Sequence, residues 1–209
     1  MKFHTRYILS TFGGKAVRRV SIEDVCERFG ANTRNTINFM ISYGYIIRIL
    51  RGLYYVKMLE EFALKKAVDI YKVLSLGMDE LGIRWYFGLY SALRFNGVTH
   101  EFSDTVFVLN DKIFRPREVK VAGEKVRFIK LSPSLFGFGV IDRDGVRFSD
   151  LEKTLLDFVY LSKYRSIPEE RIASMIEEYA KEARTEKIRE YLRSYPKTVG
   201  KVIENAGLI

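Results

Sequence analysis

The sequence predicts an α+β fold, with an N-terminal winged helix-turn-helix over residues 1–58 and a mixed α+β domain over residues 59–209 that ends in a helical layer. Three observations support this prediction. Two helical patterns, separated by a glycine-containing turn and followed by a hairpin pattern, are typical of a winged helix-turn-helix. Helical and strand-like patterns alternate in the middle of the chain. Apolar residues recur at helical spacing through the last forty residues.

The composition is that of an ordinary globular protein, with 47% hydrophobic and 29% charged residues among 209. The single cysteine, Cys26, excludes an intrachain disulfide, and two histidines beside it leave almost no ligands for a zinc site. No apolar stretch approaches the roughly 20 residues that cross a bilayer. We therefore expect a cytoplasmic protein without a membrane partner. The absence of Gln and the abundance of Lys, Arg and Glu favour a thermophilic source.

Helix start and stop signals divide the first 58 residues. A helix over Thr5–Phe12 is expected to end at Gly13 and Gly14, and a second is expected to start at a capping Ser21 and run to Phe29. Thr33 is expected to cap a third helix that runs through Tyr43 and stops at Gly44. Strand-like runs at Tyr45–Ile49 and Leu53–Lys57 then form a hairpin with a basic tip.

The third helix has one apolar and one polar face. Four polar residues fall within an arc of about 100° on a helical projection, and no acid interrupts them. Arginine and asparagine are the side chains that hydrogen-bond guanine and adenine edges. The residues expected to read DNA bases are Thr33, Arg34, Asn35, Asn38 and Ser42.

Positive charge is concentrated in the same segment. Residues 1–58 hold ten Lys or Arg and three acids, a net charge of +7 out of +9 for the whole chain. Such an asymmetry points to a polyanionic partner. The cations expected on or near the hairpin and the second helix, where they would contact DNA phosphates, are Arg18, Arg19, Arg48, Arg51 and Lys57. The alternative interpretation is a winged helix used for protein contacts.

The remaining chain predicts mixed elements. Helices are expected at Leu59–Leu76, ended by Gly77, and at Trp85–Asn96, ended by Gly97. Strands are expected at Phe102–Leu109, Val119–Leu131 and Phe136–Phe148. A capping box of Ser149 and Glu152 is expected to open a buried helix, and further helices follow Pro168 and Pro196.

Three motifs resemble the AbiEi family, the abortive-infection antitoxins of type IV toxin–antitoxin systems. They are Arg51-Gly52-Leu53-Tyr54-Tyr55-Val56, then Tyr90-Ser91-Ala92-Leu93 with Gly97-Val98-Thr99, and Asp150-Leu151-Glu152-Lys153-Thr154-Leu155-Leu156-Asp157. The resemblance implies a winged helix that represses its own operon and a C-terminal domain that counteracts a nucleotidyltransferase-like toxin. The segment after Ile167 has no counterpart that we can match residue by residue.

An enzymatic alternative starts from Asp142-Arg143-Asp144, since two carboxylates at this spacing suit a divalent metal in a nucleotidyltransferase or nuclease. Asp144-Gly145 between apolar pairs is, however, a strong hairpin-turn signal. We therefore expect no catalytic site, metal or cofactor. The sequence predicts a DNA-binding repressor that acts on its own promoter, with paired half-sites suiting a homodimer on DNA.

Overall fold

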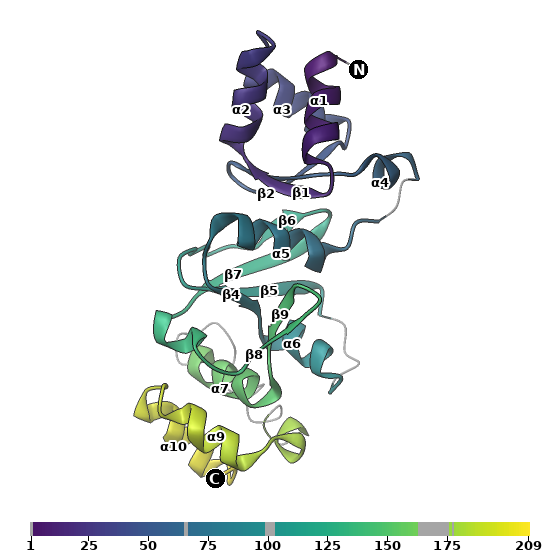
Figure 1. Cartoon of the computed structure of the whole chain (residues 1–209). Helices are drawn as coiled ribbons and strands as arrows, with labels where there is room; N and C mark the ends of the chain where they lie inside the picture. Colours follow the sequence, from purple (N-terminus) through teal and green to yellow (C-terminus); the bar gives the residue numbers. More distant parts are fainter. Residues whose placement is uncertain (1, 65–66, 99–102, 163–175, 177) are drawn as a thin grey trace. The chain divides into compact units, whose positions relative to one another are not determined.

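The structure is a computed structural model that describes residues 2–64, 67–98, 103–162, 176 and 178–209. Most of the helix expected after Pro168, and Thr99 of the second motif, lie outside these residues. The chain forms two compact units (Figure 1). One contains Met1–Ile83 with Lys120–Glu124, and the other contains Arg84–Val119 with Lys125–Ile209.

The first unit combines helices with a small antiparallel sheet. Its elements are α1 (Phe3–Phe12), β1 (Lys15–Arg18), α2 (Arg19–Arg28), α3 (Thr33–Ser42), β2 (Ile46–Leu50), β3 (Leu53–Val56), α4 (Leu59–Ala63) and α5 (Ile70–Leu81). The strands are ordered β1-β3-β2. The apolar faces of α1, α2 and α3 meet β1, β2 and β3 in one core formed by Ile8, Leu9, Val17, Ile22, Val25, Cys26, Ile37, Met40, Ile46, Tyr54 and Val56.

The compact unit extends beyond the boundary that the charge distribution suggested near residue 58, because α5 packs against β1 and β3. The helix expected over Leu59–Leu76 is two helices, α4 and α5, and Asp69 caps the second by accepting a hydrogen bond from the Tyr71 amide. Gly77 lies inside α5 rather than at its end. A Cβ there would come within 2.6 Å of Ile49 Cδ1, so glycine allows the helix to approach β2 closely.

The second unit takes its strands from a mixed sheet ordered β6-β7-β5-β4-β9-β8, apart from Lys120, Val121 and Glu124, which are grouped with the first unit. Its strands are β4 (Trp85–Phe87), β5 (Thr105–Asn110), β6 (Val119–Val121), β7 (Glu124–Lys130), β8 (Val140–Arg143) and β9 (Val146–Ser149). Its helices include α6 (Leu89–Asn96), η1 (Pro133–Phe136), α7 (Leu151–Ser162), η2 (Ala180–Glu182), α9 (Thr185–Leu192) and α10 (Lys197–Asn205). β5 pairs with β7 in parallel and with β4 antiparallel.

Helix α7 is the central helix of this unit. Ten of its twelve residues are buried, as its apolar pattern predicts. It packs against α6, α9 and α10. The expected helix over Trp85–Asn96 begins as a strand, β4, because the Trp-Tyr-Phe run is buried on both faces of the sheet; α6 then ends at left-handed Gly97 as expected. The mixed α+β prediction is therefore confirmed, and α9 and α10 are helical as expected.

Candidate nucleic-acid interface and the buried polar cluster

Helix α3 presents a polar surface to solvent. Arg34, Asn35, Asn38 and Ser42 are exposed, while Met40 on the opposite side is buried. The helix begins where Asn32, and not Thr33, accepts a hydrogen bond from the Asn35 amide at 3.0 Å. Asparagine at the N-cap satisfies an amide that has no partner within the helix. Thr33 is therefore a half-buried residue of the first turn and not the cap.

Three arginines from separate elements surround a depression beside α3. The depression has a volume of about 530 Å³ and is lined by Arg19, Arg34, Ile37, Asn38, Arg48 and Tyr54. Arg19 comes from α2. Arg34, Ile37 and Asn38 come from α3, and Arg48 and Tyr54 come from β2 and β3, respectively. Arg19, Arg34, Asn38 and Arg48 are among the residues predicted from the sequence to contact DNA. The structure brings them together on one surface.

The charge of this depression is largely unneutralised. Among the described residues, no carboxylate pairs with Arg34 or Arg48, and Arg19 makes only a long contact of 3.7 Å with Glu23. The Arg48 guanidinium lies 6.0 Å from the centre of the Tyr54 ring, a cation–π arrangement that holds the arginine on the strand pair. The depression is thus suited to an anionic ligand.

Tyr54 was missed by sequence reasoning. The hairpin register indicates that Tyr54 contacts Arg48, because the two residues lie directly opposite each other in the pairing of β2 with β3. Facing residues on neighbouring strands interact across the sheet. The confirmed hairpin over Ile46–Val56 would have identified this pair.

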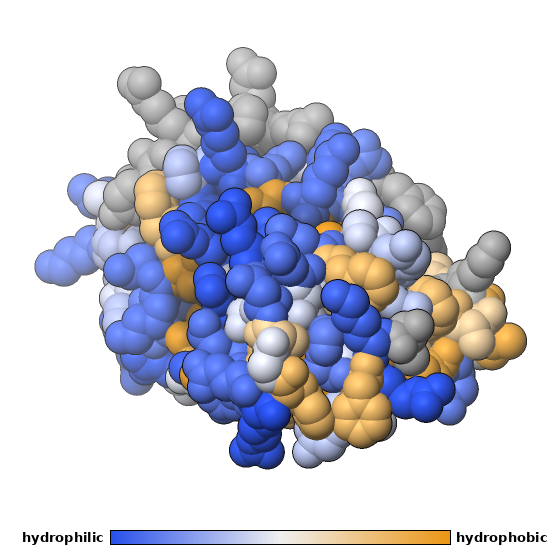
Figure 2. Space-filling view, turned by 90° about the horizontal axis from the view of Figure 1, so that it is seen from above, coloured by the Kyte–Doolittle hydropathy of each residue, from blue (hydrophilic) through white to orange (hydrophobic). Residues whose placement is uncertain are grey.

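Other expected contact residues differ in their surroundings. Arg18 donates to the Glu80 carbonyl at 2.8 Å and approaches its carboxylate at 3.5 Å, so this arginine is engaged by α5. Ser42 Oγ donates to the Phe39 carbonyl of its own helix. Arg51 is exposed at the tip of the β2–β3 hairpin, and Lys57 is half-buried beyond its end. In Figure 2, which looks onto the helices of this unit, hydrophilic residues cover much of the visible surface.

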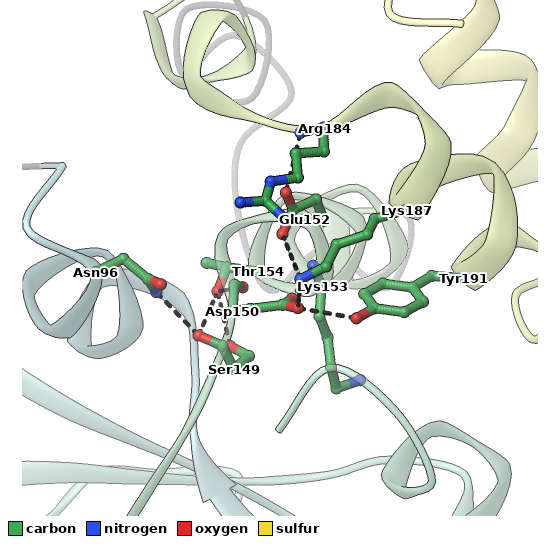
Figure 3. Close-up of polar contacts among 9 residues, drawn as sticks. All are labelled: Asn96, Ser149, Asp150, Glu152, Lys153, Thr154, Arg184, Lys187 and Tyr191. Atoms are coloured by element: carbon green, nitrogen blue, oxygen red, sulfur yellow. Dashed lines mark hydrogen bonds and ion pairs between the residues drawn. The ribbon is translucent and has the colours of Figure 1, made fainter. Parts of the chain in front are cut away.

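A second polar group gathers at the start of α7 (Figure 3). Asp150 accepts the Lys153 amide at 2.9 Å and therefore caps the helix, a role we had expected of Ser149 and Glu152. Its other oxygen accepts from Lys187 Nζ at 3.0 Å and from the Tyr191 hydroxyl at 2.9 Å. Glu152 instead accepts the Arg184 amide at 2.9 Å. Both carboxylates thus join α7 to the segment around α9.

Deeper in the same unit lies a fully buried ion pair. Lys153 Nζ is 3.5 Å from Asp157 Oδ1, and neither side chain is exposed. Asp157 also accepts the hydroxyls of Tyr86 at 2.7 Å and Tyr195 at 2.6 Å. Burial raises the pKa of Asp157 and lowers that of Lys153, and their mutual attraction opposes both shifts. The rings of Tyr86, Phe138 and Tyr195 lie within 5.6 Å of the ammonium.

The carboxylate oxygens of the third motif, Asp150–Asp157, bind other residues of the same unit. Each oxygen of Asp157 has a hydroxyl donor, and Asp150 and Glu152 bind neighbouring segments. The cluster thereby connects β4, α7 and the C-terminal helices. We interpret the Asp150–Asp157 motif as the structural centre of the second unit.

Asp142 and Asp144 occupy the β8–β9 hairpin, which confirms the predicted turn. Asp144 and Gly145 both have positive φ angles, 53° and 78°. Asp142 accepts the Gly145 amide at 3.0 Å and pairs with Arg147 at 3.2 Å. Among residues that the structure describes, no three His, Cys, Asp or Glu side chains form a group that could hold a metal ion.

The comparisons with known proteins concern the fold alone. No protein-family model matches the sequence, and no curated relative was found. The fold is similar to the crystal structure of the RV2827C protein from Mycobacterium tuberculosis, with a TM-score of 0.58 and 10% sequence identity over 95% of this chain and 74% of that chain. The described helices include none that is long and apolar enough to cross a membrane.

Proposed function

We propose that this protein is a sequence-specific DNA-binding repressor whose first unit acts as a winged helix-turn-helix. In this proposal α3 enters the major groove, and the β2–β3 hairpin serves as the wing. The observation that carries the proposal is the depression in which Arg19, Arg34 and Arg48 converge beside α3. Long-range attraction from unpaired cations would steer a polyanion to this surface.

The side chains divide into two roles. Arg34 and Asn38 are exposed on α3 and lack acidic neighbours on that face, so they suit hydrogen bonds to base edges. Arg48 and Arg51 lie on the hairpin, where a guanidinium suits backbone phosphates. A helix with solvent-facing charges alone would more often alternate Glu with Lys for pairing between turns.

Binding of the full-length protein to DNA upstream of its own gene tests this proposal. Arg34→Ala and Asn38→Ala should each cost about 1–3 kcal/mol on the specific duplex and little on a scrambled one, whereas Arg51→Ala should weaken both alike. Arg189→Ala, an exposed change on α9, is the matched control. Equal losses on both duplexes for all three test variants would contradict base reading by α3.

We further propose, from the resemblance to the AbiEi family, that the second unit counteracts a nucleotidyltransferase-like toxin. Support comes from the Asp150–Asp157 motif, whose residues hold α7, α9 and β4 together. Coexpression of the full-length protein with the product of the neighbouring gene should restore growth. Failure to protect, with the protein expressed and folded, would contradict the antitoxin assignment and leave DNA binding untouched.

A further inference from the structure

A second concentration of positive charge lies in the C-terminal unit. Residues 111–119 and 125–130 carry six Lys or Arg and two acids, a net charge of +4 out of +9 for the chain. Residues 59–209 as a whole have a net charge of only +2, because residues 59–83 carry three Lys and five acids. The six cations are Lys112, Arg115, Arg117, Lys125, Arg127 and Lys130.

The two acids of this segment are already engaged. Asp111 is buried and accepts from Arg84 Nε at 2.9 Å. Glu118 accepts the Thr105 hydroxyl at 3.4 Å. Among the described residues, none of the six cations has a carboxylate partner. The six cations therefore have no ion pair within the described part of the chain, and Glu118 is an exposed carboxylate of the same segment that leaves a net positive charge.

The loop that carries three of these cations, residues 111–118, is held in place at both ends. At its start the buried Asn110 side chain accepts the Lys112 amide at 3.0 Å and the Ile113 amide, and it donates to the Ile113 and Ile129 carbonyls at 3.2 Å. At its end Glu118 reaches Thr105. An ordered loop loses little conformational entropy when it binds a ligand.

These anchors place the loop alongside β7. In the parallel pairing of β5 with β7, Thr105 faces Lys125 and Asn110 faces Lys130. The loop is tied to the same two β5 residues, so its cations and those of β7 share one region of the unit. Phe114, which lies between Lys112 and Arg115 in the sequence, is 71% exposed. Cations interleaved with an exposed aromatic ring are typical of nucleic-acid-binding surfaces.

Protection of a sheet edge explains only part of this pattern. Lysines on edge strands discourage pairing with other chains, and β6 is an edge strand. Lys112, Arg115 and Arg117, however, belong to a loop that has no free strand edge to protect. Three unpaired cations on an anchored loop therefore point to a ligand.

We propose that the 111–118 loop is a second DNA-binding element, which contacts backbone phosphates of double-stranded DNA without reading sequence. This inference rests on the proposed function, because it assigns the same partner to the second unit. Lys112, Arg115 and Arg117 neutralise phosphates, and Phe114 packs against the sugar edge of the duplex. Sequence recognition remains the role of α3.

The test compares full-length variants on 40-base-pair duplexes, one containing the upstream sequence and one scrambled. The triple change Lys112→Ala, Arg115→Ala and Arg117→Ala should weaken binding to both duplexes by about tenfold or more. It should also reduce the slope of log K against log salt by about 2.7, since each phosphate contact contributes about 0.9. The matched control removes three exposed cations from α9 and α10 by Arg189→Ala, Lys197→Ala and Lys201→Ala, and should change binding less than twofold.

Two further arms separate the explanations. Arg115→Lys with Arg117→Lys keeps the charge and should retain binding within about threefold. Unchanged fluorescence of the single tryptophan, Trp85, verifies that the second unit is folded in each variant. Single-stranded RNA of the same length should bind more weakly than the duplex and lose no more in the triple variant than in the control.

The outcomes distinguish this inference from the proposed function. Wild-type affinity in the triple variant, together with lost discrimination in Arg34→Ala, would overturn the loop assignment and leave the repressor proposal standing. No binding of any duplex by the wild-type protein would overturn both. A preference for single-stranded RNA that depends on the loop cations would replace double-stranded DNA as the partner.

Discussion

Replacing Lys153 by methionine should strongly destabilise the second unit. Methionine preserves most of the side-chain volume but leaves the carboxylate of Asp157 buried without its cation. Breaking a buried ion pair from one side costs about 3–5 kcal/mol. Asp157 keeps the two hydroxyl donors of Tyr86 and Tyr195, which reduces the penalty. We therefore expect a loss of about 3 kcal/mol, near the lower end of that range.

Urea unfolding followed by Trp85 fluorescence measures this loss, because the only tryptophan lies buried in β4 of the same unit. The control is Lys201→Met on α10, an exposed position where a change should stay within about 0.5 kcal/mol. Combining Lys153→Met with Asp157→Asn removes the uncompensated charge, so the double variant should recover at least about 1 kcal/mol relative to the sum of the single changes. A loss below about 1 kcal/mol for Lys153→Met, or strict additivity of the two changes, would show that an unpaired buried charge is not what destabilises the variant.

Three other predictions concern stability. Burial and the Asp150 hydrogen bond raise the pKa of Tyr191 from 10.0 to about 12, so its contribution to stability is present below pH 10 and is lost as pH rises towards 12. Between pH 9 and 11.5, the free energy of unfolding in urea should therefore decline less in Tyr191→Phe than in the wild type. An identical decline would count against this assignment. Gly77→Ala should cost about 1 kcal/mol of stability, because crowding against Ile49 exceeds the gain in helix propensity. Adding Ile49→Val should relieve this cost in thermal unfolding, and persistence of the loss would argue against crowding. Asp144→Asn should change the free energy of unfolding by less than about 0.5 kcal/mol, since Asn-Gly suits the same turn, and a loss above about 1 kcal/mol in denaturant unfolding would contradict a simple turn role.

Local signals in the sequence predicted the elements whose limits are set by local chemistry. The end of the third helix near Gly44 and the β8–β9 turn at Asp144-Gly145 follow from the need for positive φ angles. Capping residues were identified less well. Asn32 and Asp150 act as caps where Thr33 and the Ser149–Glu152 pair were expected, because neighbouring polar residues compete for this role and only the backbone geometry decides between them.

Elements that depend on distant partners escaped prediction. β1 has only four residues, and it exists because it pairs with β3, nearly forty residues later. Gly77 resembles a helix stop in sequence, yet contact with Ile49 explains why a glycine lies inside α5. For the candidate interface, the exposed face of α3 was predictable from periodicity. The engagement of Arg18 by Glu80 and the approach of Arg48 to Tyr54 required tertiary structure.

The salt dependence of DNA binding is the sharpest test of the proposed interface around α3. If the unpaired cations around Arg19, Arg34 and Arg48 bind DNA, they must displace counterions from its phosphates. With about six phosphates neutralised, the plot of log K against log salt for the full-length protein on its upstream DNA should have a slope near −5. A flat titration, or binding that does not favour the upstream duplex over a scrambled one at any salt concentration, would contradict the account.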